Sequence, residues 1–261
     1  MAEKTKALRG LAFASVAVVL ALPAGASDQK DESYHQDYIY GAPETPSESW
    51  MISLGGRLYD NWYDTLGVDG PARTHPSWPS SNTLHKGADT WRCKSCHGFD
   101  FRGADGISYF GSYRTGIKGI RGALDRDPKE IAALLRDGTH QYTPDMIGDD
   151  KLAALALFVS KGQYDTLDYI NPDKSVNGIP ERGREIFQTT CAACHGFDGR
   201  AMNWGTTEEP GYVGTEANKN PWEVLGKIRH GHPGAEMISL AAFAVEEAAD
   251  VLKYAQTLPQ K

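Results

Sequence analysis

The sequence CKSCHGFD occupies residues 93–100, and the sequence CAACHGFD occupies residues 191–198. These stretches contain all four cysteines of the chain as two C-x-x-C pairs, and a histidine follows each pair directly. The spacing of two thiols and one adjacent imidazole is therefore the same in both places. This repetition predicts that the two stretches carry out the same chemical task.

C-x-x-C-H is the signature of covalent haem attachment. The chemistry requires this spacing, because each thiol adds to one vinyl group of the haem and the next residue binds the iron through an unprotonated ring nitrogen. We therefore predict two covalently attached haem c groups. The attachment residues and proximal ligands are Cys93, Cys96 and His97 for the first haem, and Cys191, Cys194 and His195 for the second.

Three other uses of the cysteines compete with haem attachment. A zinc site would have to bring the two pairs together, and it would leave the adjacent histidines unexplained. A thioredoxin-like redox pair needs a βαβ context, which neither flank supplies. Local disulfides in an exported protein would not require the histidines. The sequence favours haem over these alternatives.

A second pair of related stretches extends the repeat. Residues 127–138 read DPKEIAALLRDG and residues 220–231 read NPWEVLGKIRHG. In each stretch an N-cap residue precedes a proline at the first helical position, a glutamate closes a capping box, and a glycine ends the helix. Apolar helical stretches follow at residues 152–159 and 240–258. The chain is thus predicted to be all-α, a tandem duplication of a small helical unit.

The N-terminus carries an export signal. Lys4, Lys6 and Arg9 precede an uncharged apolar run at residues 11–22, and residues 24–26 provide a small-x-small cleavage site. This run is too short to span a bilayer. We therefore expect a periplasmic protein with no stable membrane insertion after cleavage of the signal peptide.

Breaks in the pattern divide the rest of the chain. Polar, proline-containing sequence follows the signal, and Asn171, Pro172 and Gly178 interrupt the region between the two repeats. The predicted parts are a signal peptide (1–26), a flexible N-terminal arm (27–49), a first domain (50–165), a linker (166–178) and a second domain (179–261).

Residues around the second motif point to a known family. Gly183, Ile186 and Phe187 precede Cys191, and Tyr254 lies in the last apolar stretch. This pattern resembles a class I cytochrome c domain, in which the first and last helices cross at a small glycine with an aromatic residue packed nearby. The whole chain is similar to a periplasmic dihaem cytochrome c. The resemblance implies two tandem class I cytochrome c-like domains.

The first half departs from this pattern. Its candidate first helix contains Gly56, Leu58 and Tyr59, and Gly56 lies 37 residues before Cys93, compared with 8 residues from Gly183 to Cys191. An insertion at about residues 60–92 therefore precedes the first haem motif. It is rich in tryptophan, which we interpret mainly as packing around the porphyrin edge, with a stacked substrate site as the alternative.

The sixth iron ligands decide between an electron carrier and a catalyst. The class I pattern places a methionine between the haem motif and the last helix, which implies Met146 for the first haem and Met237 for the second. Core filling is the alternative role for these methionines. Histidines that compete as ligands are His140, His230 and His232, together with His75 and His85 in the insertion.

Two haems with histidine and methionine ligands would pass single electrons and have no vacant coordination site. We therefore expect a free electron carrier or an electron-transfer subunit. The alternative is a dihaem oxidoreductase with a catalytic first haem, similar to thiosulfate dehydrogenases or dihaem peroxidases. Thiosulfate dehydrogenases use a cysteine as the distal ligand of the active haem, and this chain has no cysteine outside its two motifs.

The net charge of the chain is −7. No basic block offsets it, so a nucleic-acid surface is not expected. The predicted partners are redox proteins with a basic docking surface.

Overall fold

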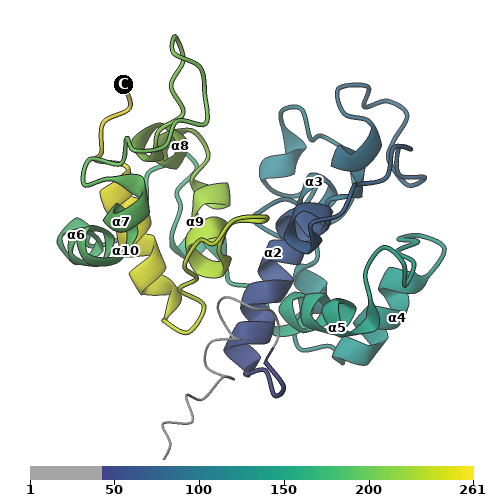
Figure 1. Cartoon of the computed structure of the whole chain (residues 1–261). Coiled ribbons are helices and arrows are strands. Elements are labelled where there is room, and N and C mark those ends of the chain that lie inside the picture. Colours follow the sequence, from purple (N-terminus) through teal and green to yellow (C-terminus); the bar gives the residue numbers. More distant parts are fainter. Residues whose placement is uncertain (1–42) are drawn as a thin grey trace, which may run out of the picture. The chain divides into compact units, whose positions relative to one another are not determined.

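The computed structural model describes residues 43–261, of which residues 45–261 form one compact unit. The predicted signal peptide and most of the predicted arm lie outside the described residues. Residues 43–261 contain helices and only two isolated β-bridges, Gly103 with Lys118 and Ile170 with Val176 (Figure 1). The all-α prediction is therefore confirmed.

The helices of the first half surround the first C-x-x-C-H motif. They are α2 (Glu48–Leu66), η2 (Gly87–Trp91), α3 (Cys93–His97), η3 (Ile107–Tyr109), η4 (Arg121–Ala123), α4 (Pro128–Arg136), α5 (Asp149–Leu157) and η5 (Phe158–Gly162). The motif itself forms α3. Helix α2 contains non-helical backbone at Asn61, whose side-chain oxygen accepts the N–H of Asp64 and so caps the segment that follows.

The second half repeats this order without the insertion. After η6 (Thr166–Asp168) come α6 (Pro180–Ile186), η7 (Phe187–Cys191), α7 (Ala192–His195), α8 (Val213–Lys219), α9 (Pro221–His230) and α10 (Val245–Ala255). The first helix therefore runs through η7 directly into the second haem motif. In the first half, about twenty-five residues of insertion separate α2 from α3.

The predicted helix starts are confirmed only in part at both α4 and α9. Glu130 accepts from the Arg126 side chain and closes no capping box, and α4 ends at Arg136, before Gly138. The Asp127 carboxylate caps α4 by accepting the N–H of Lys129, and proline occupies the first turn of both helices. The side chain of Asn220 makes no cap hydrogen bond. Its amide nitrogen instead donates to the Glu223 carboxylate at 2.8 Å.

Each half contains a close crossing of its first and last helices at a glycine. A Cβ atom on Gly55 of α2 would collide with the backbone of Ala154 in α5, and one on Gly183 of α6 would collide with the backbone of Asp250 in α10. Phe187 and Tyr254 pack beside the second crossing, with ring centroids 5.5 Å apart. The crossing glycine of the first half is thus Gly55, and the neighbouring Gly56 contacts His230 of α9.

We expect Gly183→Ala to destabilise the haem-loaded protein by about 2 kcal/mol, because the two backbones must move apart to admit the methyl group. The midpoint of urea unfolding measures this loss. Gly122→Ala is the matched control, since a Cβ atom there meets nothing within 4 Å. Equal midpoints for the two variants would contradict the close crossing.

The last helix begins later than the sequence pattern predicts. The pattern covers residues 240–258, whereas α10 begins at Val245 and ends at Ala255. The Arg229 guanidinium donates to the carbonyls of Leu240 and Phe243 at 2.7 and 2.6 Å. These bonds hold residues 240–244 as a loop, because their carbonyl groups are already engaged outside a helix.

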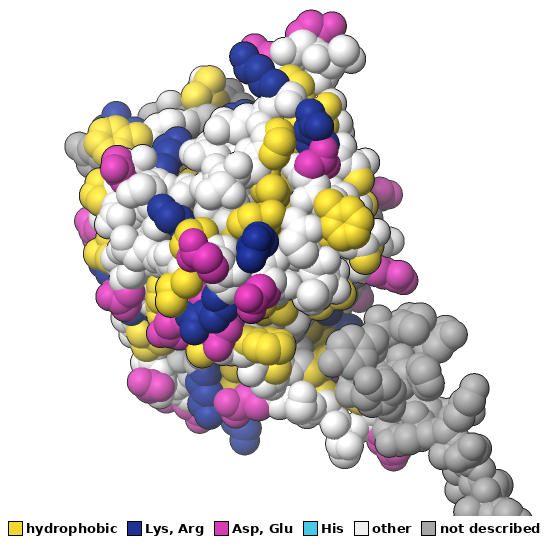
Figure 2. All heavy atoms as spheres, turned by 90° about the vertical axis from the view of Figure 1, so that its left-hand side faces the viewer, with side chains coloured by type: hydrophobic (Ala, Val, Ile, Leu, Met, Phe, Trp, Pro, Cys, Tyr) yellow, Lys and Arg dark blue, Asp and Glu magenta, His cyan; other side chains and the backbone are white. Residues whose placement is uncertain are grey.

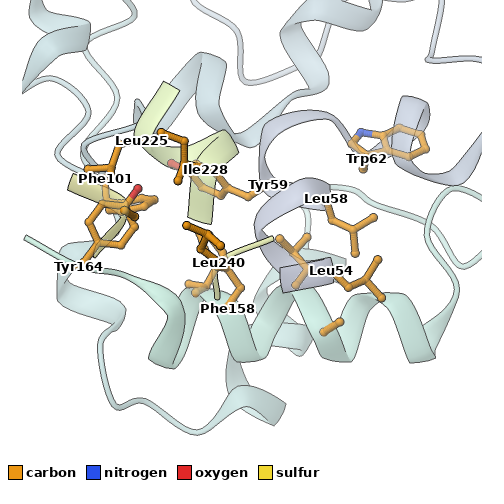
Figure 3. Packing of buried hydrophobic residues seen from close by; sticks show 14 of the residues in the cluster. Leu54, Leu58, Tyr59, Trp62, Phe101, Phe158, Tyr164, Leu225, Ile228 and Leu240 are labelled. Carbon is orange, nitrogen blue, oxygen red and sulfur yellow. The ribbon is translucent and has the colours of Figure 1, made fainter. Parts of the chain in front are cut away.

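The buried core is continuous between the two sequence repeats (Figure 3). Tyr59 of α2, Phe158 of η5 and Ile228 of α9 belong to one cluster of buried side chains. The Ser53 hydroxyl donates to the carbonyl of His230 at 3.0 Å, which ties α2 to the end of α9. The two repeats therefore share buried apolar surface and a buried hydrogen bond.

Among residues 43–261, no helix is both long enough and apolar enough to cross a membrane.

Candidate haem sites

The first motif lies in apolar surroundings. Burial raises the pKa of the Cys93 thiol to about 11 and that of the Cys96 thiol to about 12. The Tyr142 hydroxyl lies 3.9 Å from the Cys93 sulfur and donates to the carbonyl of Trp91 at 2.6 Å. The Tyr59 hydroxyl donates to the carbonyl of Gly98 at 2.6 Å, so tyrosines from two other segments fix both ends of the motif.

The ring of His97 has the tautomer that a proximal ligand needs. Its Nδ1 lies 2.7 Å from the carbonyl oxygen of Lys118, and because a carbonyl only accepts, Nδ1 carries the proton. The Nε2 lone pair is then left for a metal. Burial is the main cause that lowers the pKa of His97 to about 4, so the ring is neutral at pH 7.

A second imidazole lies close to His97. The ring centroid of His140 is 6.4 Å from that of His97, and the ring planes are inclined by 35°. The Nδ1 of His140 lies 3.0 Å from the carbonyl oxygen of Leu134, so it too must donate. The structure therefore brings His140 to the first motif.

The second motif borders a cavity. Its empty space is about 970 Å³, including the part that is open to solvent. Cys191, His195, His232 and Met237 line it. The apolar walls come from Phe187, Val213, Val224, Ile228, Val251 and Ala255.

The donor set of this cavity fits a haem c group. The thiol of Cys191, the ring of His195 and the thioether of Met237 face an apolar space, as haem attachment and axial ligation require. The Nδ1 of His195 is buried without a hydrogen-bond partner, and burial lowers the pKa of this imidazole, with a smaller contribution from His232. A neutral, weakly engaged imidazole beside an apolar cavity is suited to bind iron.

The predicted methionine Met146 lies in different surroundings. It is partly buried, packs against the hydrophobic core, and its N–H donates to the carbonyl of Thr143 at 3.0 Å. Met237 lines the second cavity directly. The two methionines therefore differ in their placement, although their distances from the haem motifs are similar.

The competing histidines of the insertion and of α9 are engaged or buried elsewhere. His75 Nδ1 accepts the N–H of Ser77, and its Nε2 lies 2.9 Å from the carbonyl oxygen of His140. His85 stacks on Tyr113 at 4.0 Å. His230 is 4% exposed, packs between the two repeats, and has no hydrogen-bond partner on either ring nitrogen.

Sequence reasoning missed two arginines that hold the loops after α4 and α9. Arg136 donates to the carbonyls of Tyr142 and Ile147 at 2.9 and 2.7 Å. Arg229 makes the equivalent bonds to the second loop described above. The signal was present, because both arginines occupy the same position in the repeats 127–138 and 220–231.

The family model described as "Cytochrome C oxidase, cbb3-type, subunit III" matches residues 179–254. These residues are therefore similar to a cytochrome c domain. The match begins just before α6 and ends within α10, so it covers every lining residue of the second cavity except Ala255. A cytochrome c domain implies a covalently bound haem c, which agrees with the donor set found there.

Among solved structures, a chain of the reducing HAO-like protein complex of Kuenenia stuttgartiensis is similar to this one. The sequence identity is 17%, the similarity covers 74% of this chain and 100% of that chain, and the TM-score is 0.25. The comparison with curated proteins found no match.

The two C-x-x-C pairs do not meet in one site. Among residues 43–261, no three histidine, cysteine, aspartate or glutamate side chains gather in a group that could hold a metal ion. A shared zinc site would need such a group. The arrangement of the cysteines therefore gives no support to the zinc alternative.

Proposed function

We propose that this chain is a periplasmic dihaem cytochrome c that transfers single electrons between redox proteins. The observation that most supports this proposal is the second cavity, where Cys191, His195 and Met237 border one apolar space. The first half repeats the same attachment motif in buried surroundings, and its His97 has a free Nε2. Each haem would supply an iron that changes its charge by one electron.

The chain's own residues would hold the second haem and keep water from it. Cys191 and Cys194 would attach it, and His195 and Met237 would supply the iron ligands. Cys191, His195 and Met237 line the cavity, whereas Cys194 is exposed. The apolar walls disfavour the oxidised haem, which carries the greater positive charge. They would therefore raise the reduction potential of the haem. Trp204 also lines the cavity and lies 5.8 Å from His195, measured between ring centroids.

The face shown in Figure 2 supports docking of a redox partner. Acidic and basic side chains are interspersed with hydrophobic ones on this face, which is the left-hand side of Figure 1. Phe197 and Trp204, in the segment that follows the second motif, are 75% and 51% exposed, and the carboxylates of Glu216 and Glu223 line the cavity. Lys227 lies in the same lining and pairs with Glu223 at 2.9 Å, so the support for a partner with a basic docking surface comes from Glu216 and the net negative charge of the chain.

We expect the denatured protein to retain two haems by intact mass, because thioether bonds survive unfolding. The variant Cys191→Ser with Cys194→Ser should retain one, as should Cys93→Ser with Cys96→Ser. A wild-type mass without haem, or a stoichiometric zinc content, would contradict the proposal. A wild-type mass with one haem would show that the protein is a cytochrome c with a single haem, and not the proposed dihaem protein.

The oxidoreductase alternative requires an iron with an open or displaceable position. Carbon monoxide added to the reduced wild-type protein tests this requirement, since it binds only where a ligand leaves the iron. We expect no binding at either haem. Stoichiometric binding at the first haem would favour the enzyme over the carrier.

A further inference from the structure

We propose that His140 is the sixth ligand of the first haem, so that His97 and His140 bind its iron from opposite faces. This inference rests on the proposed function, because it presupposes a haem on Cys93 and Cys96. It replaces the methionine implied by the class I pattern, Met146. It also gives the insertion before the first motif a role, since the insertion holds the loop that carries His140.

The distance between the two rings matches a shared metal ion. Two metal–nitrogen bonds of about 2 Å, with roughly 1.2 Å from each nitrogen to its ring centre, span about 6.4 Å. The centroids of His97 and His140 are 6.4 Å apart. The observed separation is therefore the one expected for two imidazoles that share one metal ion.

The hydrogen bonds of both rings leave the correct nitrogen free. In each ring Nδ1 donates to a backbone carbonyl, that of Lys118 for His97 and that of Leu134 for His140. Metal-binding histidines commonly make such a bond with the nitrogen that does not bind the metal. Nε2 is therefore the unprotonated nitrogen of both His97 and His140.

Backbone hydrogen bonds define which loop residues correspond in the two repeats. The N–H of Tyr142 donates to the carbonyl of Leu135, and the N–H of Leu240 donates to the carbonyl of Ile228. Leu135 and Ile228 occupy the same position in the repeats 127–138 and 220–231, so Tyr142 corresponds to Leu240.

This correspondence separates the two methionines. Met237 lies before the anchor residue Leu240, within the loop that follows α9. Met146 lies after the anchor residue Tyr142. In the first repeat the short loop between helix and anchor contains His140 instead. His140, and not Met146, therefore occupies the loop equivalent to that of Met237.

The insertion clamps the loop that contains His140. His75 is 8% exposed, and because its Nδ1 accepts the N–H of Ser77, its Nε2–H donates to the carbonyl of His140. The Ser77 hydroxyl donates to the carbonyl of Thr139 at 2.7 Å. Two side chains of the insertion thus bind consecutive carbonyls of the loop, which makes His75 a positioning residue for His140.

The test compares His140→Ala with Met146→Leu in the full haem-loaded protein. We expect His140→Ala to convert one haem to the high-spin state, to bind one equivalent of carbon monoxide when reduced, and to return to the low-spin state when imidazole is added. Met146→Leu, which preserves an apolar side chain of similar volume, should show the wild-type spectrum and bind no carbon monoxide.

The reverse result would overturn the proposal: Met146→Leu opens one iron, or His140→Ala leaves both irons low-spin. Intact mass of each denatured variant shows whether both haems are attached. Failure of the proposed function is a different result, because the wild-type protein itself would then lack one or both haems by mass.

The rate at which added imidazole replaces His140 tests the positioning role of His75. We expect His75→Ala to keep both haems low-spin and to speed the replacement of His140 by added imidazole about tenfold, which corresponds to one lost hydrogen bond to a buried loop. His75→Gln, whose side-chain amide can donate to the same carbonyl, should restore most of the wild-type rate. An unchanged rate in His75→Ala would overturn this role.

Discussion

Met237→Ala is expected to open the second iron, so that the reduced protein binds one equivalent of carbon monoxide where the wild-type protein binds none. The thioether of Met237 is the proposed ligand, and an alanine at this position has no donor atom to replace it. The methionine-to-ferric-iron charge-transfer band near the red edge of the visible spectrum should disappear in the same variant.

His232→Ala is the control for this experiment, because His232 lines the same cavity. The Nδ1 of His232 lies 2.7 Å from the carbonyl oxygen of Pro233, so this ring also has a free Nε2. We expect His232→Ala to keep the charge-transfer band and to bind no carbon monoxide. If His232→Ala opens the iron and Met237→Ala does not, the ligand is the imidazole.

Asp60→Asn is expected to lower the free energy of unfolding by about 3–5 kcal/mol, the typical cost of breaking a buried ion pair. Asp60 is 3% exposed, and its carboxylate lies 2.6 Å from Arg92 and 3.1 Å from Lys227. The substitution leaves two cations beside a neutral amide. Urea unfolding of the haem-loaded protein at pH 7 measures the loss.

Asp150→Asn is the matched control, because Asp150 pairs with Lys151 while its side chain is 71% exposed. An exposed pair contributes less than about 1 kcal/mol. A loss of the same size in both variants would show that the burial of Asp60 has no energetic consequence.

Asp60 also makes the free energy of unfolding depend on pH. Burial raises the pKa of Asp60, but the charges of Lys227 and Arg92 outweigh burial and lower it below its usual value. A carboxyl group with a lowered pKa in the folded state stabilises the protein above its unfolded pKa of about 3.9, and this contribution is lost as the pH falls through the folded value. The Asp60→Asn variant should therefore lose less stability than wild type between pH 5 and acid unfolding.

The sequence predicted the features that covalent chemistry and local backbone rules determine. The spacing of Cys191, Cys194 and His195 is the one that haem attachment requires, and Asp127 with Pro128 is a combination typical of a helix start. The close crossing at Gly183 followed from the family resemblance. Each of these features depends on residues that are neighbours in sequence or belong to a known pattern.

The distal side of the first haem could not be predicted from distances along the chain. Met146 and Met237 follow their motifs at similar intervals, but the anchor bonds of Tyr142 and Leu240 show that the loop after α4 is shorter than the loop after α9. A difference in loop length leaves no hydrophobic pattern in the sequence. The two repeats therefore cannot be aligned reliably after Gly138. The repeat aligns Arg136 with Arg229, but their backbone carbonyl partners lie in these loops and carry no sequence signal of their own.

From the contact of α2 with α9 we expect a particular order of assembly. Ser53 and His230, joined by a buried hydrogen bond, are 177 residues apart in the chain, whereas each haem motif and its flanking helices lie within a short segment. Contacts of such large sequence separation form late in folding because the loop-closure entropy is greatest for them. We therefore expect each C-x-x-C-H motif to remain accessible for the proposed haem attachment until α2 docks onto α9.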